Sequence, residues 1–198
     1  MHKRGIADMS IIKTRVCPWW GIHSFDNPLR QLVQNPERIL GDLVRPGDRC
    51  LDVGCGYGYF TVALARLVGP TGSVVAVDIQ PEMLKGVRRR AEAQHLTSRI
   101  QPCQADASGL RLEGVFDFAL AFWMVHEVPD QKAVLAEICG SLKEGGRFLM
   151  VEPKLHVGPE DFRRTIEIAE SVGFTSVEQR RIFFSRSLLM SKTMMRAA

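Results

Sequence analysis

A glycine-rich stretch is the part of this sequence whose residue types and spacing point most directly to chemistry. Residues 51–60 read LDVGCGYGYF, so an apolar run is followed at once by Gly54, Gly56 and Gly58. Glycine lets a bound molecule approach the backbone closely and lets a turn adopt positive φ. The stretch therefore predicts a ligand-binding turn between a buried strand and a helix. A tight turn that binds nothing is the alternative interpretation.

A carboxylate follows at the end of the next apolar run. Asp78 comes 26 residues after Asp52 (78 minus 52) and closes the run VVAVD. At the end of a second strand, a carboxylate can accept both hydroxyls of a ribose, which indicates an adenosine cofactor. NAD is disfavoured, because its fingerprint needs a glycine at position 59, where this chain has Tyr. The Tyr-x-x-x-Lys pair of nicotinamide-dependent reductases is also missing.

The pattern D-x-G-x-G-x-G with an acidic second-strand end resembles the class I S-adenosylmethionine-dependent methyltransferases. Four further stretches are similar to the small-molecule members of the ubiquinone and menaquinone biosynthesis type, also called methyltransferase type 11: VDIQPEML, QADA at 104–107, FDFALAFWMVHEV and LKEGGRFLMVEP. The resemblance spans about residues 48–190. It implies an enzyme that binds S-adenosyl-L-methionine and methylates a carbon, oxygen or sulfur atom of a small-molecule acceptor.

The resemblance also implies which residues contact the methionine and ribose parts of the cofactor. The turn Gly54, Cys55, Gly56 and Gly58 would line these parts, and Asp52 would orient the amino group through the turn. Asp78 would hold the ribose diol.

The adenine and the sulfonium would be held by residues further along the chain. Ile79 and Met83 would flank the adenine, although Met83 equally suits a core position on its helix. Asp106 would accept the exocyclic amine, and Ala107 would donate a backbone N–H. Phe122, at the end of the fourth strand, would lie near the sulfonium.

The residues after Phe122 bear on the acceptor. Methyltransferases of nucleobase or glutamine amino groups typically carry Asn/Asp-Pro-Pro-Tyr/Phe there, whereas this chain reads AFWMVHE at 121–127 and so disfavours those substrates. His126 is a candidate general base, with a purely positioning role as the alternative. Methyl transfer itself releases a neutral thioether, so no general acid is needed. A non-catalytic protein that binds S-adenosylmethionine is the non-enzymatic alternative.

These residues need a sheet to position them. From residue 48 onward, short β-branched apolar runs alternate with amphipathic segments, which is typical of an α/β fold. Strands are expected at 49–53, 73–77, 99–103, 116–122, 147–152, 176–184 and 187–190, and helices at 59–68, 81–94, 132–142 and 159–171. With the resemblance, this predicts a Rossmann-like doubly wound seven-stranded sheet, mostly parallel, with an antiparallel last strand.

The first 47 residues differ in character and are expected to form a helical cap on a single domain that covers 48–198. Asn-Pro pairs at 27–28 and 35–36 mark two helix starts. The connection after the fifth strand, 153–158, is too short for the substrate-covering helices of many small-molecule members. We therefore expect residues 10–28, with Trp19 and Trp20, to form a mobile lid over the donor. Fixed packing of the two tryptophans is the alternative.

Composition limits the remaining possibilities. The 198 residues are 45% hydrophobic and 24% charged, as in one globular domain. Neither a membrane-spanning run nor a signal peptide is found, so a cytoplasmic location is expected. The net charge of +4 arises from short arginine clusters among acids, without stacking aromatics, which predicts solvated faces and no nucleic-acid partner. The oligomeric state has no signature in the sequence.

The cysteines predict neither a disulfide framework nor a metal site. There are five, they are scattered, and none forms a C-x-x-C pair. Cys17 and Cys55 raise the alternative of an arsenite-type metalloid methyltransferase, in which thiolates hold the acceptor. Their spacing gives that alternative no support.

Overall fold

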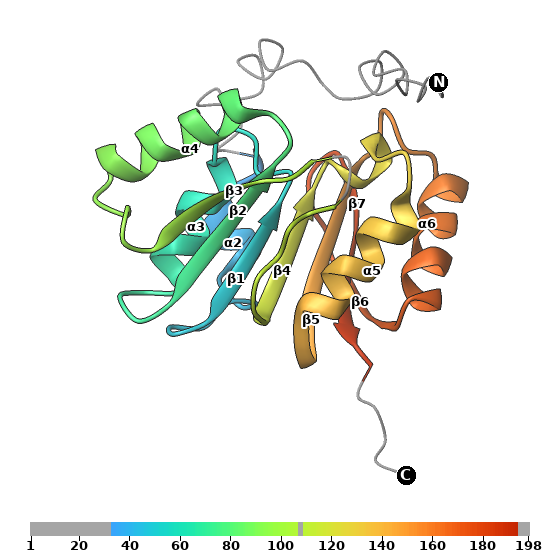
Figure 1. The fold of residues 1–198 in the computed structure, drawn as a ribbon. Coiled ribbons are helices and arrows are strands. Elements are labelled where there is room, and N and C mark those ends of the chain that lie inside the picture. The colour runs from blue at the N-terminus through green and yellow to red at the C-terminus, as the bar shows by residue number, and fades with distance from the viewer. Residues whose placement is uncertain (1–32, 107–108, 194–198) are drawn as a thin grey trace, which may run out of the picture.

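The computed structural model describes residues 33–106 and 109–193, which form a seven-stranded sheet with helices on both faces (Figure 1). The sheet order is β3-β2-β1-β4-β5-β7-β6. The strands are β1 (Arg49–Val53), β2 (Ser73–Asp78), β3 (Ile100–Gln104), β4 (Phe116–Phe122), β5 (Leu142–Pro153), β6 (Phe174–Gln179) and β7 (Ser185–Lys192). Strands β1 to β5 pair in parallel, and β7 runs antiparallel to both β5 and β6. The predicted fold class is confirmed.

Helices cover both faces of the sheet, which explains why its central strands are almost continuously apolar. They are α2 (Pro36–Leu40), α3 (Tyr59–Leu67), α4 (Pro81–Ala93), α5 (Gln131–Ser141) and α6 (Pro159–Ser171), and a 3₁₀ turn, η3, spans Val125–Glu127. Helices α2, α3 and α4 pack against one face, and α5 and α6 against the other. Neighbouring residues of β4 alternate between the two cores, with Leu120 in the first and Ala119 and Ala121 in the second.

The strand order reverses between β1 and β4. From β1 the chain proceeds outward through β2 and β3, and it then returns to the opposite side of β1 to form β4 and β5. At such a switch point the loops leaving the carboxyl ends of the two strands diverge, and ligands of open α/β sheets bind in the crevice between them. The glycine turn follows β1, and the segment with Trp123 and His126 follows β4.

Two predicted strand boundaries were wrong by several residues. The fifth strand was expected to begin at residue 147, but β5 begins at Leu142, directly after α5, because Leu142 pairs with Phe116 of β4. Residues 143–146 then bulge out of β5 before pairing resumes between Arg147 and Phe118, and Gly145 supplies the positive φ of +71°.

The other wrong boundary concerns the strand expected over 176–184. β6 stops at Gln179, because residues 180–184 turn back toward β7. The hydroxyl of Ser187 donates to the carbonyl of Arg180 at 2.6 Å, and Ser185 N donates to the carbonyl of Ile182 at 3.1 Å.

The described end of the predicted cap, residues 33–47, packs into the same core as α3. Asn35 caps α2 by accepting a hydrogen bond from Arg38 N at 3.1 Å, as the Asn-Pro pair predicts. This segment contributes three buried side chains to the core: Leu40, Leu43 and Val44. The helix start at 27–28 and the predicted lid with Trp19 and Trp20 lie outside the described residues.

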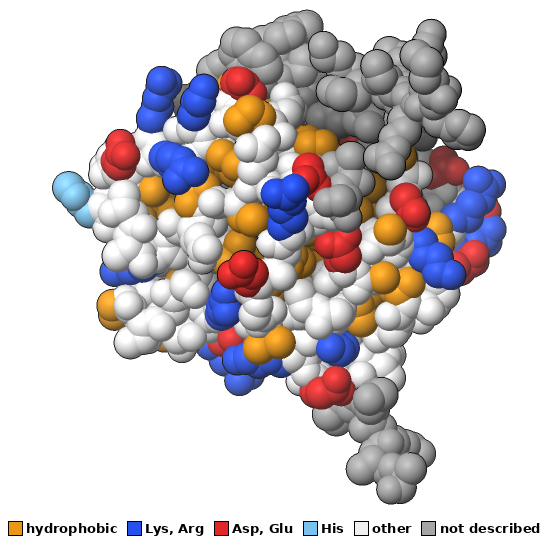
Figure 2. All heavy atoms as spheres, viewed as in Figure 1, with side chains coloured by type: hydrophobic (Ala, Val, Ile, Leu, Met, Phe, Trp, Pro, Cys, Tyr) orange, Lys and Arg blue, Asp and Glu red, His pale blue; other side chains and the backbone are white. Residues whose placement is uncertain are grey.

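The surface is of mixed charge. Figure 2 shows Lys and Arg interspersed with Asp and Glu on the face it presents. Arginines of two of the predicted clusters pair with acids, Arg164 with Asp161 and Arg180 with Asp42. Within the residues the structure covers, no helix is long and apolar enough to cross a membrane.

Candidate functional site

The glycine turn joins β1 to α3 at the switch point. Gly54, Gly56 and Gly58 have φ values of +69°, +54° and +83°, so each adopts a conformation that favours glycine. A Cβ on Gly54 would lie 2.7 Å from the Cβ of Met124, in the segment after β4, whereas a Cβ on Gly56 would meet nothing within 4 Å. The turn is therefore packed against the β4 loop at Gly54 and faces open space at Gly56.

Asp78 joins the end of β2 to this turn. Its Oδ2 accepts a hydrogen bond from Gly56 N at 3.0 Å, and its Oδ1 accepts one from Gln80 N at 2.9 Å. Burial raises the pKa of Asp78 above its usual value, although the backbone N–H groups of Gln80, Gly56 and Ile79 act in the opposite direction. Each carboxylate oxygen has a second acceptor position, so the side chain can still receive two hydroxyl groups.

Asp52 lies one strand position before the turn and is buried beneath it. Its Oδ2 accepts a hydrogen bond from the hydroxyl of Thr61, on α3, at 2.5 Å. The pKa of Asp52 is raised to about 7: burial raises it most, the hydrogen bond from Thr61 lowers it in part, and the charge of Asp78 raises it. Asp52 thus ties the start of α3 to β1, a contact that the sequence analysis did not anticipate because Thr61 lies within an apolar helical run.

The residues predicted to hold adenine differ in exposure. Ile79, directly after Asp78, is 39% exposed although it is apolar, as expected of a side chain available to a flat ring. Met83 is fully buried, as expected of a core residue of α4. Its predicted contact with adenine remains untested.

The stretch that contains Asp106 lies beside the end of β2. Ala105 N donates to the carbonyl of Asp78 at 3.1 Å, and the carboxylate of Asp106 pairs with Arg111. Asp106 thus directly follows a residue that is hydrogen-bonded to the end of β2. Ala107 lies outside the described residues, and the roles of both residues in binding adenine stay predictions.

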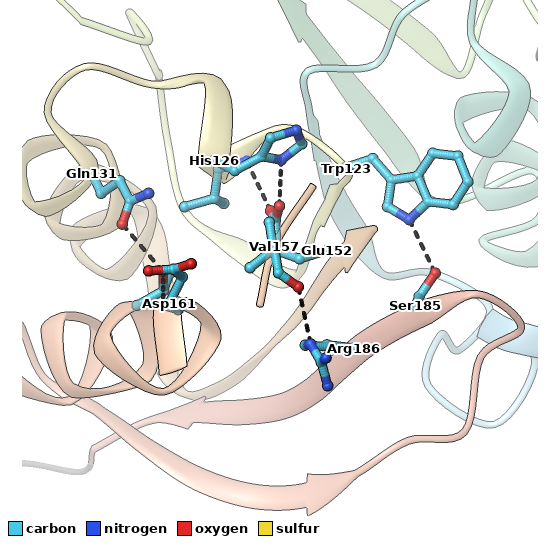
Figure 3. Close-up of polar contacts among 10 residues, drawn as sticks. Trp123, His126, Gln131, Glu152, Val157, Asp161, Ser185 and Arg186 are labelled. Atoms are coloured by element: carbon cyan, nitrogen blue, oxygen red, sulfur yellow. Dashed lines mark hydrogen bonds and ion pairs between the residues drawn. The ribbon is translucent and has the colours of Figure 1, made fainter. Parts of the chain in front are cut away.

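Aromatic side chains line the end of β4. The Phe122 ring stacks on that of Phe60 from α3, with centroids 4.1 Å apart and planes 27° apart, and it contacts Trp123. Trp123 has a φ of +61°, which costs energy in a bulky residue. Two bonds hold it there: Trp123 N donates to the carbonyl of Val151 at 2.7 Å, and the indole N–H donates to the Ser185 hydroxyl at 3.0 Å (Figure 3).

His126 lies in η3 and faces the carboxyl end of β5. Its Nδ1 is bonded to Oε2 of Glu152, while Oε1 of the same carboxylate accepts a hydrogen bond from Val125 N at 3.0 Å. Figure 3 shows the carboxylate of Glu152 facing His126, and the second ring nitrogen of His126 pointing away from it. The ring of His156 lies 5.7 Å from that of His126, between centroids.

The electrostatic balance at His126 favours its protonated form. Burial lowers the pKa of His126, but the hydrogen bond and charge of Glu152 and the charge of Glu127 outweigh this and raise the pKa above its usual value. Glu152 ends the strand expected at 147–152, but the sequence analysis gave it no role. The available signal was a charged residue at the end of an otherwise apolar strand.

Cys55 does not have the surroundings of a thiolate. It is 8% exposed, and burial, with the charges of Asp52 and Asp78, raises the pKa of the thiol well above its usual value. Among the described residues no group of His, Cys, Asp and Glu could hold a metal ion. The structure therefore adds nothing in favour of the metalloid alternative.

Comparison with known proteins places the chain among the methyltransferases that its sequence resembles. A family model described as "Methyltransferase domain" matches residues 45–179. The ubiquinone/menaquinone biosynthesis C-methyltransferase UbiE of Teredinibacter turnerae is 40% identical over 110 residues, which are 55% of this chain and 44% of that protein. The demethylmenaquinone methyltransferase of Lactobacillus johnsonii is 36% identical over 117 residues, 59% of this chain and 48% of that protein. The matched part thus spans less than half the length of these curated relatives.

Solved structures share the fold. A SAM-dependent methyltransferase from Aquifex aeolicus superposes with a TM-score of 0.80 at 21% identity, over 90% of this chain and all of that one. A putative S-adenosyl-L-methionine-dependent methyltransferase from Methanococcus maripaludis gives a TM-score of 0.75 at 19% identity, over 98% of this chain and all of that one. At these identities the likeness shows the architecture of the chain.

Proposed function

The chain belongs to the methyltransferase-domain family, and from this premise we propose that it transfers the methyl group of S-adenosyl-L-methionine to a small-molecule acceptor. One observation carries the proposal: Asp78 at the end of β2 holds the backbone of the glycine turn at the point where the strand order reverses. Such a carboxylate beside a glycine turn suits a ribose and the chain attached to it.

The residues present fit this cofactor. Gly56 faces open space on the turn, so a ligand can approach the backbone there. The carboxylate of Asp78 has acceptor positions beyond its bonds from Gly56 N and Gln80 N, as a ribose diol requires. Ile79 offers an exposed apolar surface beside it for a purine ring. Asp52 supports the same turn from below through Thr61.

When bound, S-adenosylmethionine supplies an electrophilic methyl group on a positively charged sulfur. The chain's own residues then have three tasks. The turn and Asp78 orient the donor, because placing two reactants in line supplies much of the rate of a displacement. The aromatic pair Phe122 and Trp123, at the end of β4, provides ring faces that stabilise a nearby cation by about 0.5–2 kcal/mol. His126 accepts a proton from the acceptor where the acceptor must lose one.

Several finer features of this function belong to the same proposal. Among carbon, oxygen and sulfur, carbon is the favoured acceptor atom, because a relative bears the name C-methyltransferase. The side-chain pairing of arginines with acids supports a small molecule over a nucleic acid as the acceptor. The four cysteines within the described part of the chain are free thiols, which supports a reducing, cytoplasmic compartment.

The test is label transfer. The protein is incubated with methyl-labelled S-adenosylmethionine and fractions of a metabolite extract, and labelled products are separated and identified. We expect label in at least one small molecule with wild type and a large decrease with Asp78→Ala, which would bind the donor less tightly. Calorimetry with S-adenosylhomocysteine accompanies the screen. Tighter binding of NADH than of S-adenosylhomocysteine would overturn the cofactor assignment, and binding without any label transfer would favour a non-catalytic binding protein.

A further inference from the structure

The carboxylate of Glu152 is the most deeply buried charged group near His126. Its side chain is 1% exposed, and it lies near the end of β5 directly beneath η3. Both of its oxygens bind the segment after β4: Oε1 accepts from Val125 N at 3.0 Å, and Oε2 binds Nδ1 of His126. A buried carboxylate is costly unless it is paired and hydrogen-bonded, so a position this enclosed calls for a reason.

The geometry points to Glu152 as a positioning residue, which fixes His126 in the tautomer with hydrogen on Nδ1 and a lone pair on Nε2. This inference rests on the proposed function, since the tautomer matters for the proton that the acceptor loses. An ionised carboxylate can only accept hydrogen bonds, so the nitrogen that faces Glu152 must carry the hydrogen. In the neutral ring the other nitrogen then holds the lone pair.

The direction of the ring matches that role. Nε2 points away from Glu152 (Figure 3), and the His126 side chain is 20% exposed, so the ring is not sealed in the core as Glu152 is. Among the residues that the structure describes, the other titratable groups facing the imidazole are Glu127, in the same turn, and His156, after β5. Glu152 is the group whose hydrogen bond to the ring sets the tautomer.

The proton of the acceptor moves to Nε2 of His126. The bond between hydrogen and the reacting atom of the acceptor breaks, its electron pair stays on the acceptor, and an N–H bond forms at Nε2. The acceptor atom then bonds to the methyl carbon, while the electron pair of the carbon–sulfur bond returns to sulfur. His126 leaves the step as an imidazolium stabilised by the Glu152 carboxylate, and it returns its proton to water.

Replacing Glu152 with glutamine gives a sharp test, because the backbone of Val125 can only donate. The amide oxygen of Gln must therefore face Val125 N, and its NH₂ group must face Nδ1 of His126. Nδ1 then becomes an acceptor, so the hydrogen moves to Nε2 and removes the lone pair from the side that would face the acceptor. The volume of the side chain barely changes.

The tautomer is read from two-bond ¹H–¹⁵N correlation spectra of the full chain, recorded above the titration midpoint of His126. His126→Gln identifies its signal among those of the five histidines. We expect protonated Nδ1 in wild type, protonated Nε2 in Glu152→Gln, and no change in Glu127→Gln, the control that removes a neighbouring charge without removing the ring's hydrogen-bond partner. The pKa of His126 should also fall in Glu152→Gln.

Two results would overturn the inference: a wild-type ring with hydrogen on Nε2, or a folded Glu152→Gln protein that keeps hydrogen on Nδ1. If Glu152→Gln does not fold, the wild-type spectrum alone decides. The measurement needs no acceptor, so its failure is distinguishable from that of the proposed function. Once an acceptor is known, turnover by Glu152→Gln should fall about 10²–10⁴-fold, the usual contribution of a general base, while Glu127→Gln should stay close to wild type.

Discussion

Asp78 offers the sharpest test of the cofactor site, because its two carboxylate oxygens hold the glycine turn and the start of the α4 segment at once. Gly56 N lies 3.0 Å from Oδ2, and Gln80 N lies 2.9 Å from Oδ1. Asp78→Ala removes these bonds together with the acceptors offered to a ribose diol. Hydrogen bonds to a charged group contribute about 1.5–3 kcal/mol, so the affinity for S-adenosylhomocysteine should fall about 10- to 150-fold.

Isothermal titration calorimetry with S-adenosylhomocysteine measures this loss. A matched control is Asp117→Ala, at the amino end of β4 and thus at the opposite edge of the sheet. Asp117 also accepts two hydrogen bonds, from Arg49 N at 2.9 Å and from Lys143 Nζ at 2.6 Å. We expect its loss to leave the affinity unchanged. Thermal unfolding of each variant verifies that it is folded. A folded Asp78→Ala protein that binds as tightly as wild type would refute the assignment of Asp78 to the ribose.

Three further predictions test the rest of the site. His126→Ala should lower turnover about 10²–10⁴-fold with little change in cofactor affinity. The wild-type rate should rise with pH through the pKa of His126, which lies above its usual value. An unchanged pH profile in the variant would exclude the role of general base. The pKa of Asp52 is raised from 3.8 to about 7, so its stabilising contribution is full below pH 4 and is lost as pH rises to 7. Asp52→Asn should therefore unfold like wild type at pH 4 but be more stable above pH 7, by up to about 4 kcal/mol in urea titrations; equal stability at pH 8 would contradict this. Gly54→Ala should lower the free energy of unfolding by about 1–3 kcal/mol, because Gly54 has a φ of +69° and the new Cβ would lie 2.7 Å from that of Met124. The control Gly140→Ala, inside α5 beside open space, should raise it by about 0.5–1 kcal/mol. The opposite order would show that the backbone of the turn can shift to accommodate the methyl group.

Much of the sheet was predictable because local patterns report burial directly. Strands β1 and β4 and helix α6 have the expected bounds, since each is a continuous apolar or amphipathic run between clear stop signals. The start of β5 was missed for a non-local reason. Gly145 and Gly146 have the composition of a helix stop, but Leu142 is drawn into the sheet by Phe116, which lies far away in the sequence.

The contact between the glycine turn and Asp78, at the proposed cofactor site, was also predictable, because these residues are ordered along the chain. Gly56 and Asp78 are 22 residues apart, and a parallel sheet with a crossover helix brings the ends of neighbouring strands together. The surroundings of His126 were less predictable. The sequence indicated His126 as a candidate base but not its hydrogen-bond partner, because that partner, Glu152, comes from another strand, β5.

The sequence by itself thus determined the fold class, the family and the residues of the turn, since these depend on periodicity and on the conformations that glycine allows. Only the tertiary structure decided which groups are hydrogen-bonded to the buried carboxylates. Glu152 meets His126, and Thr61 meets Asp52, because packing β5 beside β4 and α3 over β1 buries these carboxylates. A buried charge must find a donor within hydrogen-bonding distance, and which donor lies there is set by the arrangement of elements in space.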